Sequence, residues 1–224
     1  SGFMEGRLGR YAVCVRPAGG EFRTVGVFEA CEVEEVVARY SMGCDVWVSA
    51  QPVTGVETGR GSFDNVAALA VVYCDLDVKQ GGMPTEEAAE QVIDDLSALL
   101  GQRPIFRVRT GHGIQPYWLI EDGEFTTDAD RVAGHTLLRQ LGRLVSRVAH
   151  DRGGAADAVF DLPRMLRAPA TMNVKGDPVP VSLLADTGGP LTLEELRERL
   201  DEYCPEVASD SQRRGERVNI ADAL

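Results

Sequence analysis

The sequence lacks the features that mark membrane, secreted and zinc-binding proteins. It contains no apolar run of about 18 residues, which a membrane-spanning helix would need, and no stretch with the pattern of a signal peptide. Its five cysteines include no Cys-x-x-Cys pair and have no histidine at ligand spacing, so neither a disulfide framework nor a zinc site is indicated. We therefore expect a cytoplasmic protein with reduced thiols, no zinc and no membrane contact.

Basic residues are scarce relative to acidic ones, and the formal net charge is -12 at pH 7. Proteins that coat nucleic acid unaided use Lys and Arg to displace counterions, so this class is disfavoured. Two segments, 103–118 and 162–176, nevertheless contain no acid. Their basic side chains are Arg103, Arg107, Arg109 and His112 in the first segment, and Arg164, Arg167 and Lys175 in the second. An anionic ligand is expected at these two basic segments.

The pattern of apolar and turn residues predicts one mixed α/β or α+β domain. A chain of 224 residues that is 44% hydrophobic is long enough for a large core. Residues 1–3 are interpreted as the remnant of an expression tag, residues 4–190 as the main domain, and residues 191–224 as a helical appendage that leads to further domains. Helices are expected at 28–40, 85–100, 127–150 and 192–203, and strands at 45–50, 71–79, 105–109, 114–120 and 179–184, after a hairpin at 6–27.

The strand predicted at 71–79 is an apolar run that ends at two carboxylates, Asp75 and Asp77. Because successive side chains of a strand alternate between its faces, both carboxylates would project from one face, while Cys74 and Leu76 point into the core. Two like charges on a half-buried strand are costly unless a cation lies between them. The pair therefore indicates either a divalent-metal site or two acids that face water at the end of a strand.

A third carboxylate would complete a two-metal site, which stabilises both the attacking and the leaving oxygen in phosphoryl transfer. Asp161 is the candidate, because it ends an apolar run and precedes the second basic segment. In that segment Arg164, Arg167 and Lys175 suit a triphosphate, although a solvated loop with surface charges would look the same.

The turn after the strand predicted at 105–109 contains two glycines, which let the backbone approach a ligand closely. Thr110, His112 and Gln115 offer polar groups that could hold phosphate or sugar oxygens. A tight turn with a solvated histidine is the other interpretation of the same residues.

Three segments in this order resemble the primase-polymerase domains of the archaeo-eukaryotic primase superfamily, in the phage and plasmid type that precedes a replicative helicase. The segments are 72–79 (VYCDLDVK), 109–118 (RTGHGIQPYW) and 161–175 (DLPRMLRAPATMNVK). The third is the most specific, because the family typically has Asp, Arg, Arg-x-Pro-Gly-Thr, Asn and Lys at these intervals. The resemblance implies an α/β fold in which an N-terminal αβ subdomain and a modified RNA-recognition-like sheet share one cleft.

The resemblance also implies a catalytic site. Asp75, Asp77 and Asp161 would be the ligands of two Mg²⁺ or Mn²⁺ ions. The residues expected around the incoming nucleotide are Thr110, His112, Gln115, Arg164, Arg167, Asn173 and Lys175, and further candidates are Arg60, Asn65 and Arg109.

The reaction that the resemblance implies is template-directed nucleotidyl transfer. A primer 3′-hydroxyl, or that of the first nucleotide, attacks the α-phosphate of an NTP or dNTP on a single-stranded DNA template. The implied partner is a replicative helicase, fused or separate, and the implied location is the cytoplasm of a bacterial or archaeal host.

The sequence departs from the family pattern at two positions. The family hairpin usually ends in Gly-x-His, with the imidazole near the nucleotide phosphates, whereas Gln115 occupies that place here and the nearest imidazole is His112. Either side chain is a candidate for the role. Ala170 replaces the usual Gly, which is a mild change if the position does not require a positive φ.

Two functions of other kinds remain open from the residues. An RNA-recognition-like module could bind nucleic acid or nucleotide without catalysis, but such domains read bases with aromatic side chains, and only 6% of this chain is aromatic. A nucleotide-sugar transferase with an Asp-x-Asp pair would also use a metal ion. It has no need, however, for the Arg-x-x-Arg and Asn-x-Lys pattern of the third segment.

Overall fold

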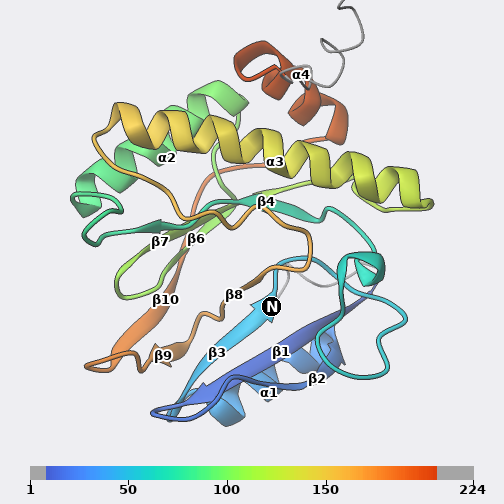
Figure 1. Ribbon diagram of the computed structural model, residues 1–224, viewed down its shortest axis with the longest axis vertical. Helices are drawn as coiled ribbons and strands as arrows, with labels where there is room; N and C mark the ends of the chain where they lie inside the picture. Colours follow the sequence, from blue (N-terminus) through green and yellow to red (C-terminus); the bar gives the residue numbers. More distant parts are fainter. Residues whose placement is uncertain (1–8, 206–224) are drawn as a thin grey trace, which may run out of the picture.

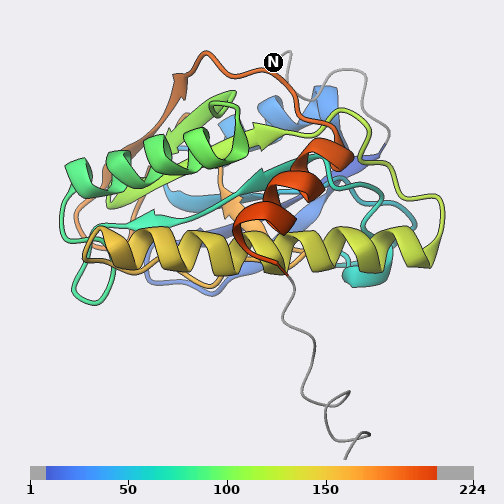
Figure 2. The ribbon, with the colours of Figure 1, turned by 90° about the horizontal axis from the view of Figure 1, so that it is seen from above.

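The two sheets of this protein lie between two layers of helices, as Figure 1 shows for the computed structural model, which describes residues 9–205. Helices α2 (Glu86–Leu100), α3 (Asp128–Asp151) and α4 (Leu193–Tyr203) cover one face of the larger sheet, and α1 (Ala30–Tyr40) packs on the smaller sheet. Viewed from above, α2, α3 and α4 lie side by side over the strands (Figure 2). The mixed α+β fold predicted from the sequence is confirmed.

All pairings between the named strands are antiparallel. The smaller sheet has the order β2-β1-β3-β8 and contains β1 (Arg10–Pro17), β2 (Arg23–Glu29), β3 (Cys44–Ser49) and β8 (Met165–Arg167). The larger has the order β4-β7-β6-β10-β9, with β5 also paired to β7, and contains β4 (Val71–Tyr73), β5 (Leu76–Asp77), β6 (Phe106–Arg109), β7 (Gly113–Leu119), β9 (Thr171–Asn173) and β10 (Val179–Ala185). The segment 161–175 thus contributes one strand to each sheet.

Helices α2, α3 and α4 begin where the sequence predicted, because each start carries a threonine cap. Thr85 accepts a hydrogen bond from a backbone N–H of the first turn, and Thr127 and Thr192 form capping boxes with Asp130 and Glu195. These caps satisfy backbone donors that have no partner within the helix. In the described part of the chain, no helix combines the length and the apolar character that crossing a membrane requires.

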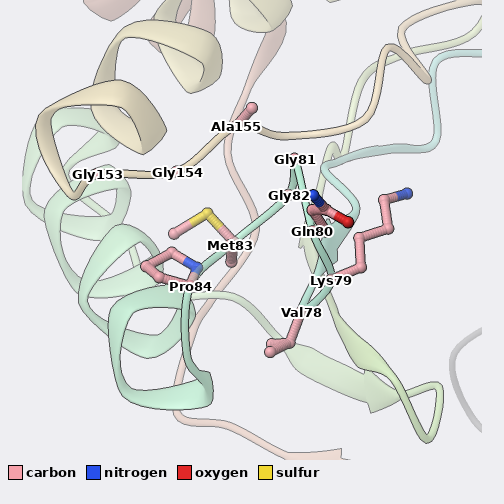
Figure 3. Close-up of a pocket in the computed structure, with 10 residues that line it drawn as sticks. All are labelled: Val78, Lys79, Gln80, Gly81, Gly82, Met83, Pro84, Gly153, Gly154 and Ala155. Atoms are coloured by element: carbon pink, nitrogen blue, oxygen red, sulfur yellow. The ribbon is translucent and has the colours of Figure 1, made fainter.

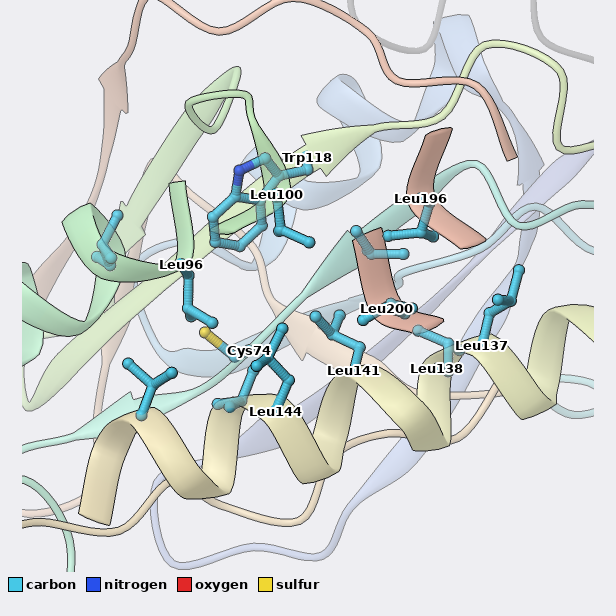
Figure 4. Packing of buried hydrophobic residues seen from close by; sticks show 14 of the residues in the cluster. Cys74, Leu96, Leu100, Trp118, Leu137, Leu138, Leu141, Leu144, Leu196 and Leu200 are labelled. Carbon is cyan, nitrogen blue, oxygen red and sulfur yellow. The ribbon is translucent and has the colours of Figure 1, made fainter. Parts of the chain in front are cut away.

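Three clusters of buried side chains fill the interfaces between the layers. The largest lies between the larger sheet and helices α2, α3 and α4, and includes Leu96, Trp118 and Leu141 (Figure 4). A second lies between the smaller sheet and α1. The third, which includes Tyr73 and Tyr117, lies between the two sheets. Burial of apolar side chains therefore holds every layer to its neighbour.

Helix α4 is part of the largest cluster. Leu196 and Leu200 are fully buried in it, and the Gln140 side chain of α3 donates a hydrogen bond of 2.8 Å to Asp201. The segment after residue 190, which the sequence suggested as an appendage, thus contributes to the main core as far as Cys204. The remainder of that segment, 206–224, and the interpreted tag remnant at 1–3 lie outside the described residues.

The strand predicted at 71–79 is interrupted. Strand β4 ends at Tyr73 and β5 begins at Leu76, so Cys74 and Asp75 lie between them. The Asp75 carbonyl accepts a hydrogen bond of 3.1 Å from the Asp157 N–H rather than from a neighbouring strand. Between β4 and β5, this hydrogen bond to the chain after α3 therefore takes the place of a hydrogen bond to a neighbouring strand.

Ala170 is the one non-glycine residue with a positive φ among residues 9–205, at 61°. It lies between β8 and β9, and its N–H donates a 2.9 Å hydrogen bond to the Val181 carbonyl. The condition for a mild replacement is therefore not met, because a side chain in the left-handed region costs about 1–2 kcal/mol. Ala170 therefore adopts a left-handed conformation that glycine would adopt without this cost.

Ala170→Gly is expected to raise the free energy of unfolding by up to about 1 kcal/mol, because relief of the left-handed strain outweighs the greater freedom of glycine in the unfolded chain. Urea denaturation measures this difference. Ala18→Gly, in the exposed turn between β1 and β2 where φ is not positive, serves as the matched control and is expected to lower the stability. Lower stability of both variants would contradict the prediction.

Candidate active site

Asp75 lies between β4 and β5 and Asp77 lies in β5, close to it, and the neighbouring Cys74 and Leu76 are fully buried, as predicted. Oδ1 of Asp75 is buried and has no hydrogen-bond partner. Burial and the charge of Asp77 raise the pKa of Asp75 to about 7, although a hydrogen bond from Gln115 acts in the opposite direction. A buried carboxylate oxygen without a partner is unusual in a folded protein and marks a position that a ligand can satisfy.

A third carboxylate, that of Asp157, lies beside this pair. Its charge adds to the rise in the pKa of Asp75, after burial and Asp77. The Lys79 ammonium lies 2.8 Å from Oδ2 of Asp157 and 3.2 Å from Oδ2 of Asp77. A cation of the protein itself therefore lies between two of the three carboxylates.

Asp161, the sequence candidate for the third ligand, has other contacts. Its carboxylate pairs with Arg164, at 2.7 Å from Nε, and its carbonyl accepts a hydrogen bond of 3.0 Å from the Tyr73 hydroxyl. The carboxylates that act on Asp75 are Asp77 and Asp157. The apolar run 158–160 has an acid at each end, and the sequence alone gave no reason to choose Asp157 over Asp161.

These carboxylates suit a hard divalent cation, which prefers oxygen ligands. The unpartnered Oδ1 of Asp75 and the ammonium between Asp77 and Asp157 both indicate a place for positive charge. No group of three or more His, Cys, Asp or Glu side chains within residues 9–205 is arranged to hold a metal ion as it stands. Binding of an ion would therefore require the carboxylates to move closer together.

The turn between β6 and β7 joins this acidic end of the site to β9. Gly113 pairs with Asp77, and the His112 carbonyl accepts a hydrogen bond of 2.7 Å from the Val78 N–H. The Asn173 amide nitrogen donates to the Thr110 carbonyl at 2.8 Å and lies 3.1 Å from Nδ1 of His112. Thr110, His112 and Asn173, all predicted site residues, are thus brought together beside the Asp-x-Asp pair.

Only glycine fits at position 113. A Cβ atom there would lie 2.5 Å from the Leu76 carbonyl oxygen and 2.9 Å from a carboxylate oxygen of Asp77. The glycine that the sequence suggested for close approach to a ligand therefore allows close approach of two strands.

Gln115 and His112 occupy different environments. Gln115 is buried, its Oε1 accepts a hydrogen bond of 3.3 Å from the Tyr117 hydroxyl, and its side chain hydrogen-bonds Asp75. His112 is exposed. Gln115 therefore positions a carboxylate of the Asp-x-Asp pair, whereas His112 is accessible to a ligand.

Asp45 organises the second basic segment, and the sequence reasoning missed it. This carboxylate is only 1% exposed; it accepts hydrogen bonds from Arg167 at 2.7 Å, from Arg16 at 2.6 Å and from the Val174 N–H at 2.9 Å. Both guanidinium groups also lie over the ring of Trp47, at 5.2 and 5.4 Å from its centroid. Arg167 is thus held in place from two sides, while Lys175 is exposed beyond β9.

The first basic segment does not form an anion site, apart from His112. Arg109 pairs with Glu86 and Glu90 of α2, on the face of β6 opposite Phe106 and Val108. The other two arginines of this segment pair with acids as well: Arg103 with Asp94 and Asp186, and Arg107 with Glu90 and Asp186. Strand alternation thus turns Arg109 toward α2, and its expected role near the nucleotide stays a prediction.

The two candidates before the first motif have contacts of their own. The Asn65 side chain accepts a hydrogen bond from the Ser62 N–H and donates to the carbonyls of Thr54 and Gly55, which closes the loop around the short 3-10 helix Phe63–Asn65. Arg60 lies over the Phe22 ring, at 6.0 Å from its centroid. These contacts give both residues a role in loop structure.

A cavity of about 560 Å³ opens beside Lys79 (Figure 3). Its walls are the loop between β5 and α2, from Val78 to Pro84, and residues Gly153, Gly154 and Ala155 after α3. Four of the lining residues are glycines, so backbone rather than side chains forms much of the wall. Open space therefore lies beside Lys79, the residue whose ammonium pairs with Asp77 and Asp157.

Two solved structures are similar to this fold. The archaeo-eukaryotic primase domain of the primase-polymerase of cyanophage S-2L superimposes with a TM-score of 0.58 and 14% identity, covering 88% of this chain and 92% of that chain. The primase RepB′ superimposes with a TM-score of 0.56 and 20% identity, covering 92% of this chain and 60% of that chain. No model of a protein family matches the sequence, and no curated protein matches it significantly. The chain thus has the fold of archaeo-eukaryotic primase domains, which confirms the fold that the motifs implied.

Asp45→Asn is expected to lower the free energy of unfolding at neutral pH by about 3 kcal/mol, because it leaves Arg167 and Arg16 without their buried partner. Burial raises the pKa of Asp45, but hydrogen bonds from Arg167, Arg16 and the Val174 N–H outweigh it, and the net shift is downward. This stabilisation is present above the ordinary aspartate pKa of about 3.9 and is lost as the pH falls through the lowered pKa.

Urea denaturation of both proteins at several pH values measures this effect, and the difference between them should shrink in acid. Asp94→Asn, which removes an exposed partner of Arg103, is the matched control and should change the stability by less than about 0.5 kcal/mol. Equal effects of the two substitutions would rule out a special role for Asp45.

Proposed function

We propose that this protein is a template-directed nucleotidyltransferase of the primase-polymerase kind. The observation that carries the proposal is the buried, unpartnered Oδ1 of Asp75 beside Asp77 and Asp157, in a fold shared with primase domains. A nucleic-acid-binding module without catalysis has no reason to keep three carboxylates where phosphates would be repelled.

Asp75, Asp77 and Asp157 are the proposed ligands of Mg²⁺ or Mn²⁺, with Asp157 in place of Asp161. When bound, such ions would activate the attacking hydroxyl and balance the charge of the phosphates. Other side chains of the protein hold these carboxylates in position without touching the ion themselves. Gln115 hydrogen-bonds Asp75 and is itself fixed by Tyr117.

The proposed nucleotide contacts come from the turn between β6 and β7 and from the segment that contains β8 and β9. Asn173 fixes His112 and the Thr110 carbonyl, so that the exposed imidazole can donate to a phosphate oxygen. Lys175 and Arg164 add positive charge, and Asp45 fixes the position of the Arg167 guanidinium. These groups would orient the triphosphate and stabilise the charge that develops during transfer.

The proposed substrates are a single-stranded DNA template and an NTP or dNTP. A primer 3′-hydroxyl, or that of the first nucleotide, attacks the α-phosphate, and pyrophosphate leaves. A replicative helicase is the proposed partner, in phage or plasmid replication.

Primer synthesis and extension on single-stranded template, with Mg²⁺ or Mn²⁺ and labelled nucleotides, tests this proposal. Asp75→Asn, Asp77→Asn and Asp157→Asn are each expected to lower the rate by about 100-fold or more, since even residues that only support metal ligands contribute 10- to 100-fold. Asp161→Asn, the matched control four residues from Asp157, is expected to have a smaller effect. No product from the unmodified protein at saturating nucleotide would exclude catalysis. A larger loss in Asp161→Asn than in Asp157→Asn would restore Asp161 as the third ligand.

His112→Ala and Gln115→Ala are expected to differ in steady-state kinetics. Loss of the exposed imidazole should raise the KM for nucleotide about tenfold, because a charge-assisted contact to phosphate disappears. Loss of Gln115 should mainly lower kcat, because it frees the carboxylate of Asp75. Equal and negligible effects in both variants would exclude this turn from the site.

A further inference from the structure

Lys79 is one of only two lysines in the chain, which otherwise uses arginine for its basic side chains. Its ammonium is 2.8 Å from Oδ2 of Asp157 and 3.2 Å from Oδ2 of Asp77. The neighbouring Oδ1 of Asp75 is buried and has no partner. Two of the three proposed metal ligands are therefore already paired with a cation that belongs to the protein.

We propose that Lys79 is a built-in counter-ion, which occupies the cation position at Asp77 and Asp157 until a divalent ion binds and displaces it. The inference rests on the proposed function, because it concerns the same three carboxylates. It assigns a positioning role to the last residue of the first motif segment, for which the resemblance implied none.

The carboxylates need such a counter-ion because like charges on a partly buried strand repel one another. An ammonium between two of them reduces that repulsion and allows β5 and the chain after α3 to stay together without a metal ion. The hydrogen bond from the Asp157 N–H to the Asp75 carbonyl also requires these two segments to stay close together. Lys79 thus stabilises the arrangement into which a divalent ion would bind.

The same ammonium must leave when a divalent ion arrives, because two cations cannot share two carboxylate oxygens at these distances. Lys79 can leave readily. Its side chain is 46% exposed, it belongs to the loop between β5 and α2, and the cavity in Figure 3 opens beside it. Displacement therefore breaks two exposed ion pairs, each of which contributes little, and returns a flexible ammonium to water.

Calorimetric titration of the metal-free protein with Mn²⁺ tests the inference directly, because it measures binding and not activity. Lys79→Met is expected to bind Mn²⁺ roughly three- to tenfold more tightly than the unmodified protein, since the competing ammonium is gone. Lys79→Arg keeps the charge and is expected to stay near the unmodified value. Arg39→Met, which removes an exposed ion pair with Glu35 on α1, is the matched control and should leave the affinity unchanged.

The outcomes separate this inference from the proposed function. Equal or weaker binding by Lys79→Met, with clear binding by the unmodified protein, would overturn the counter-ion role and leave the metal site intact. No binding by either protein would overturn both.

Amine labelling of the unmodified protein gives a second readout that needs no variant. With only two lysines, mass spectrometry can follow Lys79 against Lys175 as the internal reference. Mn²⁺ is expected to increase the labelling of Lys79 relative to Lys175, because the freed amine is no longer shielded by Asp77 and Asp157. Asp77→Asn should abolish the effect at the same ionic strength. A labelling ratio that does not change with Mn²⁺ would show that Lys79 stays in place.

Discussion

The buried carboxylate of Asp45 is the interaction on which the arrangement of the two sheets around the site depends. Strands β8 and β9 are three residues apart in the chain but belong to different sheets, and Asp45 bonds to both ends of this crossing, at Arg167 and at the Val174 N–H. Arg16 of β1 binds the other carboxylate oxygen. A charge buried in this way is tolerated only because every lone pair has a partner, and the geometry of the crossing is fixed as a result.

The basic and acidic side chains of the larger sheet have different surroundings in different parts of the sheet. The arginines of the first basic segment are neutralised by acids of α2 and by Asp186 after β10, as the pair formed by Arg109 and Glu86 illustrates. The unpartnered Oδ1 of Asp75 and the exposed His112 lie instead near the place where β7 meets β5. A net charge of -12 is therefore compatible with a site for an anionic ligand, because local pairing rather than the total charge decides where such a ligand can approach.

Local signals in the sequence predicted most of the fold. Threonine caps and helical periodicity located α2, α3 and α4, and the turn at Thr110 located the hairpin, because these depend on neighbouring residues. The choice between Asp157 and Asp161 could not be made in this way, since it depends on where the chain after α3 crosses β4. Asp45 gave no signal at all, because its partners Arg167 and Val174 are more than a hundred residues away in the chain. The positive φ of Ala170 is a different case, because the glycine usual in the resembling family marked the position while the alanine itself gave no sign of the conformation.

The burial of α4 has a consequence for the minimum length of the domain. Leu196 and Leu200 fill the angle between α2 and α3, so a polypeptide that stopped after β10 would expose the apolar sides of both helices to water. The sequence motifs all end by Lys175, and a fragment trimmed to them would retain every proposed ligand yet lose part of its apolar core. A fragment that keeps the core intact therefore has to include α4, which ends at Tyr203, well beyond the last residue with a proposed chemical role.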